Sequence, residues 1–176
     1  MILDLTDFLD REYKIPNQNE SRDLDAFIEK HEKEILKELL GYELFAELES
    51  ALNSSAELEE RWVDLRDGAE YTYNGKTYKW LGLVDLLKPA VYSRWINVGT
   101  YKFTNVGFVQ NNAQQQSATL EDMEPFIVRA WNEFVLKVGY NYEQRFGTFY
   151  GFMKANEADY ESWCFTEQKF KNRHSL

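Results

Sequence analysis

Apolar residues recur at intervals of three and four along most of this chain, a pattern that predicts amphipathic helices. The clearest run lies between Ser21, which is expected to cap the first long helix, and Gly41, which is expected to end it in a left-handed conformation. A second run, Tyr42 to Leu52, follows at once, so the two helices are predicted to meet at a tight corner. The apolar positions of the first helix are Leu24, Phe27, Ile28, Ile35, Leu36, Leu39 and Leu40.

Further helices follow from the same periodicity. Ser54 and Glu57 have the spacing of a capping box for a short helix that ends at Gly68. A longer helix is predicted to begin near Asp85 and to tolerate Pro89 in its first turn. The broadest apolar stripe belongs to a later helix and comprises Phe126, Ile127, Ala130, Trp131, Phe134, Val135 and Val138.

One segment alternates between apolar and polar residues instead of following a helical period. Between Tyr71 and Lys79, two short arms flank Asn74-Gly75, a dipeptide that supplies the positive φ angles of a type I′ turn, and this predicts a β-hairpin. A two-stranded hairpin is marginally stable alone in water, so its aromatic residues must pack on something. The candidate partner-contact residues are its tyrosines, Tyr71, Tyr73 and Tyr78.

These elements predict a mainly α fold, a compact bundle of about five to six helices with one small hairpin. We expect a single domain over residues 1–176, because a chain of this length can bury about 70% of its unfolded surface and no long polar linker divides it. A short helix or arm, Leu3 to Tyr13, is expected at the N-terminus. An extended or frayed tail is expected after Phe165.

The most unusual segment is a run of eighteen residues without a charge, Phe103 to Leu120, in a chain of which 28% is charged. It combines a short apolar run with a Gln/Asn tract that cannot build a core, and we expect a long extended loop from Phe103 to Thr119. A loop of this length inside a compact domain is more often functional than idle. The predicted oligomer-interface residues are Val106, Gly107, Phe108, Val109, Gln110, Asn111 and Asn112.

The charge of the chain argues against some classes of function. The formal net charge of −10 argues against a protein that grips phosphate backbones, because that affinity comes from Lys and Arg. The acids run along predicted helix faces, as in Glu29, Glu32, Glu34 and Glu38, and such runs are usually solvated. The one cysteine, Cys164, excludes an internal disulfide. The acidic N-terminus and the lack of an apolar run near 20 residues predict a cytosolic product without a membrane span.

The catalytic candidates are few. His31 falls on the apolar stripe of its helix with Glu34 one turn on, which favours a half-buried histidine that hydrogen-bonds locally. A metal site would need ligands from other helices, and the paired Glu-x-x-His motifs of a di-metal bundle do not occur in the sequence. We therefore expect no catalysis, no cofactor and no metal, and a bundle enzyme with a metal at His31 is the alternative.

Several pieces, taken in order, resemble the head-tail connector (adaptor) proteins of tailed phages and prophages. They are the N-terminal arm, the run from Glu34 to Phe45 (EILKELLGYELF), the aromatic central helix, Val106 to Val109, and Trp131 to Phe134 (WNEF). The resemblance covers most of the chain, and its strongest piece is the LLGYELF corner. The predicted hairpin from Tyr71 to Lys79 departs from the family pattern.

The resemblance implies a small, mainly helical structural subunit that forms a homo-oligomeric ring, commonly of twelve copies, beneath the portal. Its partners would be the portal and tail proteins, and DNA would pass through the ring without being specifically bound. The implied locations are the virion after assembly and the bacterial host cytoplasm after synthesis. By position, the arm that reaches a neighbour would be Phe103 to Thr119, with the tail after Phe165 as a second candidate. The alternative is a non-enzymatic helical interaction module that uses exposed aromatic residues of the hairpin.

Overall fold

The structure is a computed structural model that describes residues 1–8, 13, 21–99, 101–104, 107–110, 120–139, 147–165 and 170–171. Within these residues it contains six α-helices and two antiparallel hairpins, so the predicted mainly α fold with a hairpin after the third helix is confirmed. In chain order the elements are the 3-10 helix η1 (Leu5–Phe8), α1 (Ser21–Leu40), α2 (Tyr42–Asn53), α3 (Glu60–Asp67), β1 (Glu70–Tyr73), β2 (Lys76–Lys79), α4 (Gly82–Gly99), β3 (Tyr101–Thr104), β4 (Gly107–Gln110), α5 (Leu120–Val138) and α6 (Phe149–Ala155).

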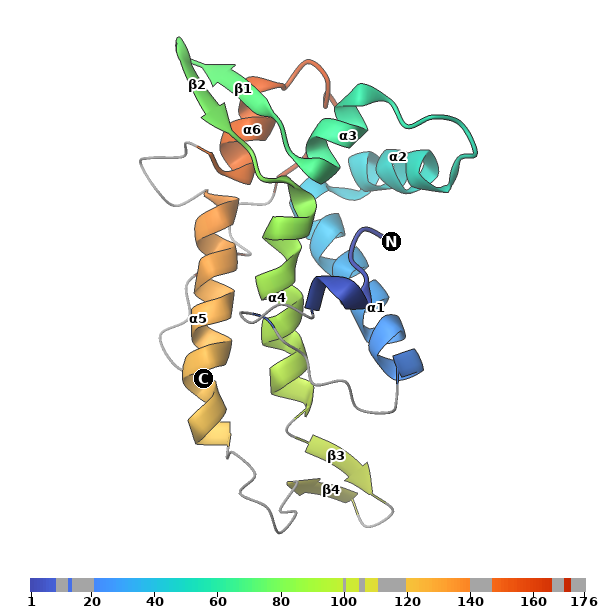
Figure 1. The fold of residues 1–176 in the computed structure, drawn as a ribbon, viewed down its shortest axis with the longest axis vertical. Helices are drawn as coiled ribbons and strands as arrows, with labels where there is room; N and C mark the ends of the chain where they lie inside the picture. Colours follow the sequence, from blue (N-terminus) through green and yellow to red (C-terminus); the bar gives the residue numbers. More distant parts are fainter. Residues whose placement is uncertain are drawn as a thin grey trace.

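Three long helices form the body of the molecule. Helix α4 lies between α5 and α1 and packs against both (Figure 1). Helices α2, α3 and α6 and the β1–β2 hairpin gather where α4 begins and α5 ends, and we call this the closed end. The β3–β4 hairpin lies beyond the last turn of α4, and we call this the open end.

Helix α4 owes its central position to a sequence that is apolar around most of its circumference. Leu86, Leu87 and Val91 are fully buried, and the polar Ser93 is buried as well. The Ser93 hydroxyl donates a hydrogen bond of 3.1 Å to the carbonyl oxygen of Ile127 in α5, so its burial leaves no polar atom unpaired. A helix with apolar residues on several faces is the expected neighbour of two other helices.

The apolar stripe predicted for α5 is confirmed except at its first residue. Ile127, Phe134 and Val138 are fully buried, but Phe126 is 59% exposed. Neighbouring residues in a helix are turned by about 100° from each other, so Phe126 falls on the flank of a stripe centred on Ile127. The predicted apolar stripe therefore included one residue too many.

Pro89 lies in the interior of α4, because the helix begins at Gly82 and not near Asp85 as predicted. Proline has no N–H, so the carbonyl of Asp85, four residues earlier, lacks its helical donor. Lys137 of α5 supplies a replacement, since its Nζ lies 3.1 Å from that carbonyl oxygen and 3.0 Å from the Asp85 carboxylate. The same Nζ lies 3.0 Å from a carboxylate oxygen of Glu133. The defect in α4 thus becomes a link between α4 and α5.

The corner between α1 and α2 forms as predicted. Gly41 has a φ of 81°, and a Cβ atom at this position would lie 2.9 Å from the carbonyl oxygen of Cys164. The segment after α6 approaches this closely because it caps α1: the Trp163 indole N–H donates to the Leu39 carbonyl at 2.9 Å, and the Cys164 N–H donates to the Leu40 carbonyl at 3.3 Å. Glycine is therefore required both for the turn and for the contact.

One expectation at the end of an element is wrong, and a second is decided between its two alternatives. Helix α3 begins at Glu60 without a side-chain cap, and the Ser54 hydroxyl accepts instead from the Ala56 N–H at 3.1 Å in a local turn. The tail, expected to be extended or frayed, is in no helix or strand at its described residues and is not frayed there, since Phe170 is buried against Phe134 with ring centroids 5.3 Å apart. Both outcomes depend on contacts that a local sequence pattern does not record.

Candidate functional site

The uncharged run contains strands where an extended loop was expected. β4 lies within it, and β3 overlaps its first two residues. The two strands pair antiparallel, with Phe103 opposite Phe108 and Lys102 opposite Val109. Aromatic and β-branched residues favour strands, which accounts for the difference from the predicted loop. The remainder of Phe103 to Thr119, residues 105–106 and 111–119, lies outside the described residues.

Four of the predicted interface residues make up β4, namely Gly107, Phe108, Val109 and Gln110. The other three, Val106, Asn111 and Asn112, lie outside the described residues. The hairpin follows α4 after a single residue and occupies the open end, where Figure 1 shows it beyond the body of the bundle. The structure therefore places the described part of the predicted interface at one extremity of the molecule.

The register of this hairpin groups its aromatic positions. Residues directly opposite each other in an antiparallel pair share a face, and so do residues two apart along one strand. Phe103 is opposite Phe108, and Tyr101 is two residues before Phe103. One face of the β3–β4 hairpin thus carries three aromatic positions.

The β1–β2 hairpin has the predicted turn, with φ of 50° at Asn74 and 74° at Gly75. Its aromatic residues are not all exposed as expected. Tyr71 is only 6% exposed, its ring lies 5.7 Å from that of Phe152 in α6, and its hydroxyl oxygen accepts the Gly147 N–H at 3.0 Å. Burial raises the pKa of Tyr71.

The role proposed for Tyr71 as an exposed partner contact is therefore corrected. It packs on α6 because a two-stranded hairpin needs a surface to stabilise it, and this hairpin finds that surface within its own chain. Tyr78 is half-buried beside Tyr71, at a centroid distance of 5.7 Å. Tyr73 remains 37% exposed, so it is the most accessible of the three predicted residues.

Several large apolar side chains reach the surface away from the hairpins. Two of them lie on α5, where Phe126 is 59% and Leu136 is 52% exposed. Exposed apolar residues on one helix are surface that a protein partner can bury. Among the described residues, the exposed large hydrophobic side chains are Met1, Tyr42, Tyr73, Leu81, Phe126 and Leu136.

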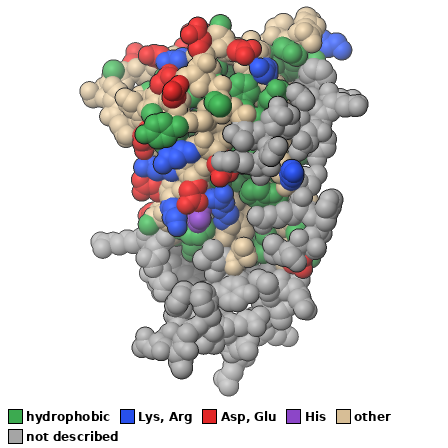
Figure 2. Space-filling view, turned by 180° about the vertical axis from the view of Figure 1, so that it is seen from behind, with side chains coloured by type: hydrophobic (Ala, Val, Ile, Leu, Met, Phe, Trp, Pro, Cys, Tyr) green, Lys and Arg blue, Asp and Glu red, His purple; other side chains and the backbone are tan. Residues whose placement is uncertain are grey.

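His31 forms the local hydrogen bond that its position predicted. Its Nδ1 lies 3.0 Å from a carboxylate oxygen of Glu34, and the same oxygen lies 2.8 Å from a guanidinium nitrogen of Arg94 in α4. The histidine ring packs on Phe27 at a centroid distance of 4.1 Å. The cluster is half-buried and reaches the surface, where Figure 2 shows a histidine (purple) between acidic and basic side chains.

Glu32 is a residue whose role the sequence reasoning missed. It was expected on a solvated face, but it is only 2% exposed, and its two carboxylate oxygens accept the N–H groups of Ile2 and Leu3, each at 2.8 Å. Burial raises the pKa of Glu32, and the two N–H groups oppose that effect. Its spacing, four residues after Ile28 and three before Ile35, puts it on the apolar stripe and was the available signal.

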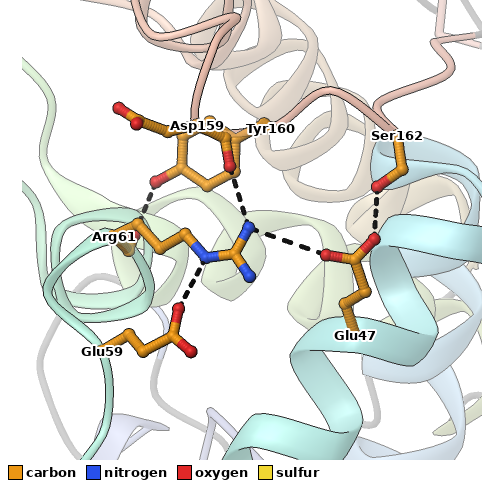
Figure 3. A network of polar contacts seen from close by, with 6 residues as sticks. All are labelled: Glu47, Glu59, Arg61, Asp159, Tyr160 and Ser162. Atoms are coloured by element: carbon orange, nitrogen blue, oxygen red, sulfur yellow. Dashed lines mark hydrogen bonds and ion pairs between the residues drawn. The ribbon is translucent and has the colours of Figure 1, made fainter.

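A second polar network holds the closed end together (Figure 3). The Arg61 guanidinium of α3 donates to the carbonyl of Asp159 at 2.9 Å and lies 3.6 Å from the Glu47 carboxylate of α2. The Tyr160 hydroxyl donates to the Arg61 carbonyl at 2.5 Å, and the Ser162 hydroxyl donates to Glu47 at 2.6 Å. Burial raises the pKa of Tyr160, which keeps its hydroxyl a donor. The network joins α2, α3 and the segment after α6.

A metal site, a membrane span and a ligand pocket each require features that can be checked in the described residues. Among them, no group of three or more His, Cys, Asp or Glu side chains could hold a metal ion. No helix in the described part of the chain is long and apolar enough to cross a membrane. A cavity of about 80 Å³ lies between α1 and α2, beside Met1 and Glu32, and is far smaller than the roughly 300 Å³ of a small ligand pocket.

Comparison with known proteins gives one match. No curated protein and no solved structure matches the chain. Residues 36–173 match a family described as "Family of unknown function (DUF6712)". Because this match spans well over half of the chain, the protein belongs to the DUF6712 family.

Proposed function

We propose that this protein is a structural subunit of the head-tail connector of a tailed phage or prophage, which joins portal to tail by forming a ring and performs no catalysis. The observation that carries the proposal is the β3–β4 hairpin, which lies beyond the helical body at the open end (Figure 1). It contains the described part of the segment that the sequence singled out, since β4 is Gly107–Gln110.

The proposal depends on what stabilises the β3–β4 hairpin. Two strands alone are marginally stable in water, and the register gives one face of β3–β4 the aromatic positions Tyr101, Phe103 and Phe108. A neighbouring subunit can bury that face or add a strand to an edge, which is a recurrent mode of protein recognition. Assembly would then stabilise the hairpin and join the subunits in one step.

A contact of this kind also suits a ring. The hairpin of one copy would bind a different surface of the next copy, and such head-to-tail contacts generate closed rings when the rotation between copies closes. The exposed apolar residues Phe126 and Leu136 on α5 offer surface for contacts of this type. Portal and tail proteins are the proposed partners at the two faces of the ring.

The charge of the chain is consistent with the proposed passage of DNA. The 30 acidic residues outnumber the 20 Lys and Arg residues, and a subunit with a net charge of −10 would repel phosphate groups, so DNA would move through the ring without being specifically bound. Figure 2 shows acidic side chains (red) interspersed with basic ones (blue) over the described part of this face. The proposed locations are the host cytoplasm after synthesis and the virion after assembly.

The alternative, an interaction module built on the aromatic residues of β1–β2, has less support. Tyr71 is buried against α6 and Tyr78 is half-buried, so of these tyrosines only Tyr73 offers much exposed surface. We therefore propose the connector role alone.

The test is assembly on the portal. The protein is co-expressed with the portal protein encoded in the same genome, and the purified complex is imaged by electron microscopy. We expect a ring on the portal with the wild type, loss of the ring with the double variant Phe103→Ser/Phe108→Ser, and retention with the matched variant Tyr73→Ser. Failure of the wild type to bind the portal, or a ring that survives the double variant, would overturn the proposal.

A further inference from the structure

The cluster of His31, Glu34 and Arg94 joins two of the three long helices. His31 Nδ1 lies 3.0 Å from the Glu34 carboxylate and 3.0 Å from a guanidinium nitrogen of Arg94. That guanidinium nitrogen lies 2.8 Å from the same Glu34 oxygen. Three polar atoms, two from α1 and one from α4, therefore form a closed triangle.

A single imidazole nitrogen cannot make both of its contacts at once. In the neutral tautomer that carries its proton on Nε2, Nδ1 is an acceptor, and it takes a hydrogen bond from the Arg94 guanidinium, which has donors and no acceptor. With a proton, Nδ1 becomes a donor, and the carboxylate of Glu34 is then its acceptor. The first bond connects α1 to α4, whereas the second lies within α1.

Burial is the largest factor that opposes protonation of the ring. Burial lowers the pKa of His31, and the positive charges of Arg94 and Lys30 lower it further, while the hydrogen bond and charge of Glu34 raise it. A protonated imidazole beside the Arg94 guanidinium would place two positive charges 3.0 Å apart, with one carboxylate to screen them. Protonation thus removes one hydrogen bond between the helices and adds a repulsion, and of the two contacts of Arg94 with α1 only the ion pair with Glu34 remains.

Aromatic packing places this triangle at the junction of α1 and α4. Phe27 lies under the His31 ring at a centroid distance of 4.1 Å and meets Trp95 of α4 edge-on at 5.1 Å. Arg94 and Trp95 are in the last two turns of α4, which ends at Gly99, and β3 begins at Tyr101. A change in the α1–α4 contact here would act close to the base of the β3–β4 hairpin.

We propose that His31, Glu34 and Arg94 form a proton-sensitive clasp, in which protonation of His31 breaks its bond with Arg94 and weakens the contact of α1 with the last turns of α4, while the ion pair between Glu34 and Arg94 is kept. The clasp is independent of the connector role, because it follows from the contacts of these three side chains. The native state prefers neutral His31, so the clasp's contribution to stability is complete above the unfolded pKa of about 6.5 and falls as the pH drops below it.

The chain is well suited to a direct measurement, because it has only two histidines, His31 and His174. In a His174→Gln background, NMR of the remaining imidazole should give a pKa for His31 below about 6.5. Removing the charge of Arg94 with Arg94→Gln should raise that pKa. The control Arg66→Gln, which removes a charge paired with Asp67 at the closed end, should leave it unchanged.

Hydrogen exchange then tests the link to α4. Corrected for intrinsic rates, the protection of amides 94–99 should fall as His31 is protonated, by up to about tenfold for each pKa unit that separates the folded and unfolded states. This pH-dependent fall in amide protection should be absent in both His31→Gln and Arg94→Gln. Because two variants are used, the test does not depend on the folding of one of them. A His31 pKa that does not respond to Arg94→Gln, or wild-type protection without a pH step, would overturn the clasp.

Discussion

The two hairpins of this protein have strands of equal length and lie at opposite ends of the helical body. In β1–β2, Tyr71 is buried against Phe152 of α6 and accepts the Gly147 N–H, so the strands are held by their own chain. The β3–β4 hairpin follows α4 directly and lies beyond the body at the open end. Because a lone two-stranded hairpin is marginal in water, the first hairpin is part of the fold and the second awaits a partner under the proposed function.

The end of the bundle that carries β1–β2 is held together by contacts between distant segments. At the closed end, the Arg61 network, the link from Lys137 to Asp85 and the capping of α1 by residues 163–164 join segments far apart in sequence. Closely packed elements of this kind are expected to open only with the whole domain, whereas less packed ones open locally. Under the proposed function, the end held by these contacts stays fixed, and the end that carries β3–β4 contacts a neighbour without a change in the core.

The largest expected effect is at the anchor of β1–β2. Tyr71→Ala should destabilise the protein by about 3–5 kcal/mol, because it removes a buried ring and its hydrogen bond. The matched change Tyr73→Ala, at a 37% exposed residue of the same strand, should cost about 0.5 kcal/mol. Urea unfolding measures both. Equal losses would show that β1–β2 is not held through Tyr71.

A smaller effect is expected where α4 and α5 are linked near the closed end. Lys137→Met should cost about 1–3 kcal/mol, because it leaves the Asp85 carbonyl without a donor. Pro89→Ala restores an N–H at that point of the helix, so Lys137→Met should cost less in the Pro89→Ala background. The double-mutant cycle is read from urea unfolding. Additive losses would mean that Lys137 acts through its ion pairs alone.

The attachment of the N-terminal arm should depend on pH through Glu32. The folded-state pKa of Glu32 is raised by burial, so the wild type loses stability relative to Glu32→Gln as the pH rises through the unfolded pKa of about 4.5 toward the folded value. The loss is about 1.4 kcal/mol for each unit between the two pKa values. Unfolding free energies at a series of pH values test this, and a difference independent of pH would contradict it.

The smallest effect on stability is expected at the open end. Phe103→Ser and Phe108→Ser should each change the unfolding free energy of the dilute protein by about 0.5 kcal/mol, because under the proposal these positions are completed by a neighbour. Urea unfolding of both variants beside Tyr71→Ala gives the comparison directly. A loss at Phe108 as large as that at Tyr71 would make β3–β4 a part of the core.

The elements predicted well from the sequence are those with local causes. The corner at Gly41 and the turn at Asn74-Gly75 follow from backbone conformations that few residues adopt easily. The burial of Glu32 and Phe170 could not be assigned with the same ease, because each depends on a segment far from it in sequence, the N-terminal arm for Glu32 and α5 for Phe170. Pattern reasoning gave Tyr71 the wrong environment for the same reason, since α6 lies some 80 residues further on.

The residues of the candidate site were predicted from the sequence, but their conformation was not. Gly107 to Gln110 was selected because the run lacks charge. Its pairing with β3 was not predicted, because it requires that Tyr101 to Thr104 forms a strand after α4 and that Gly107 to Gln110 turns back beside that strand. The role of this segment in assembly stays a prediction. His31 was correctly expected to bond locally with Glu34, whereas its contact with Arg94 depends on the packing of α1 against α4.

The central claim is that the β3–β4 hairpin contacts a second copy of the chain, and site-specific photo-crosslinking tests it most directly. A benzophenone amino acid is placed at Phe108 and, as the matched control, at Tyr73, and the concentrated protein is irradiated and analysed by mass. We predict a ladder of cross-linked oligomers from position 108 and monomer from position 73. Monomer from both positions, or oligomers from position 73 alone, would contradict the claim.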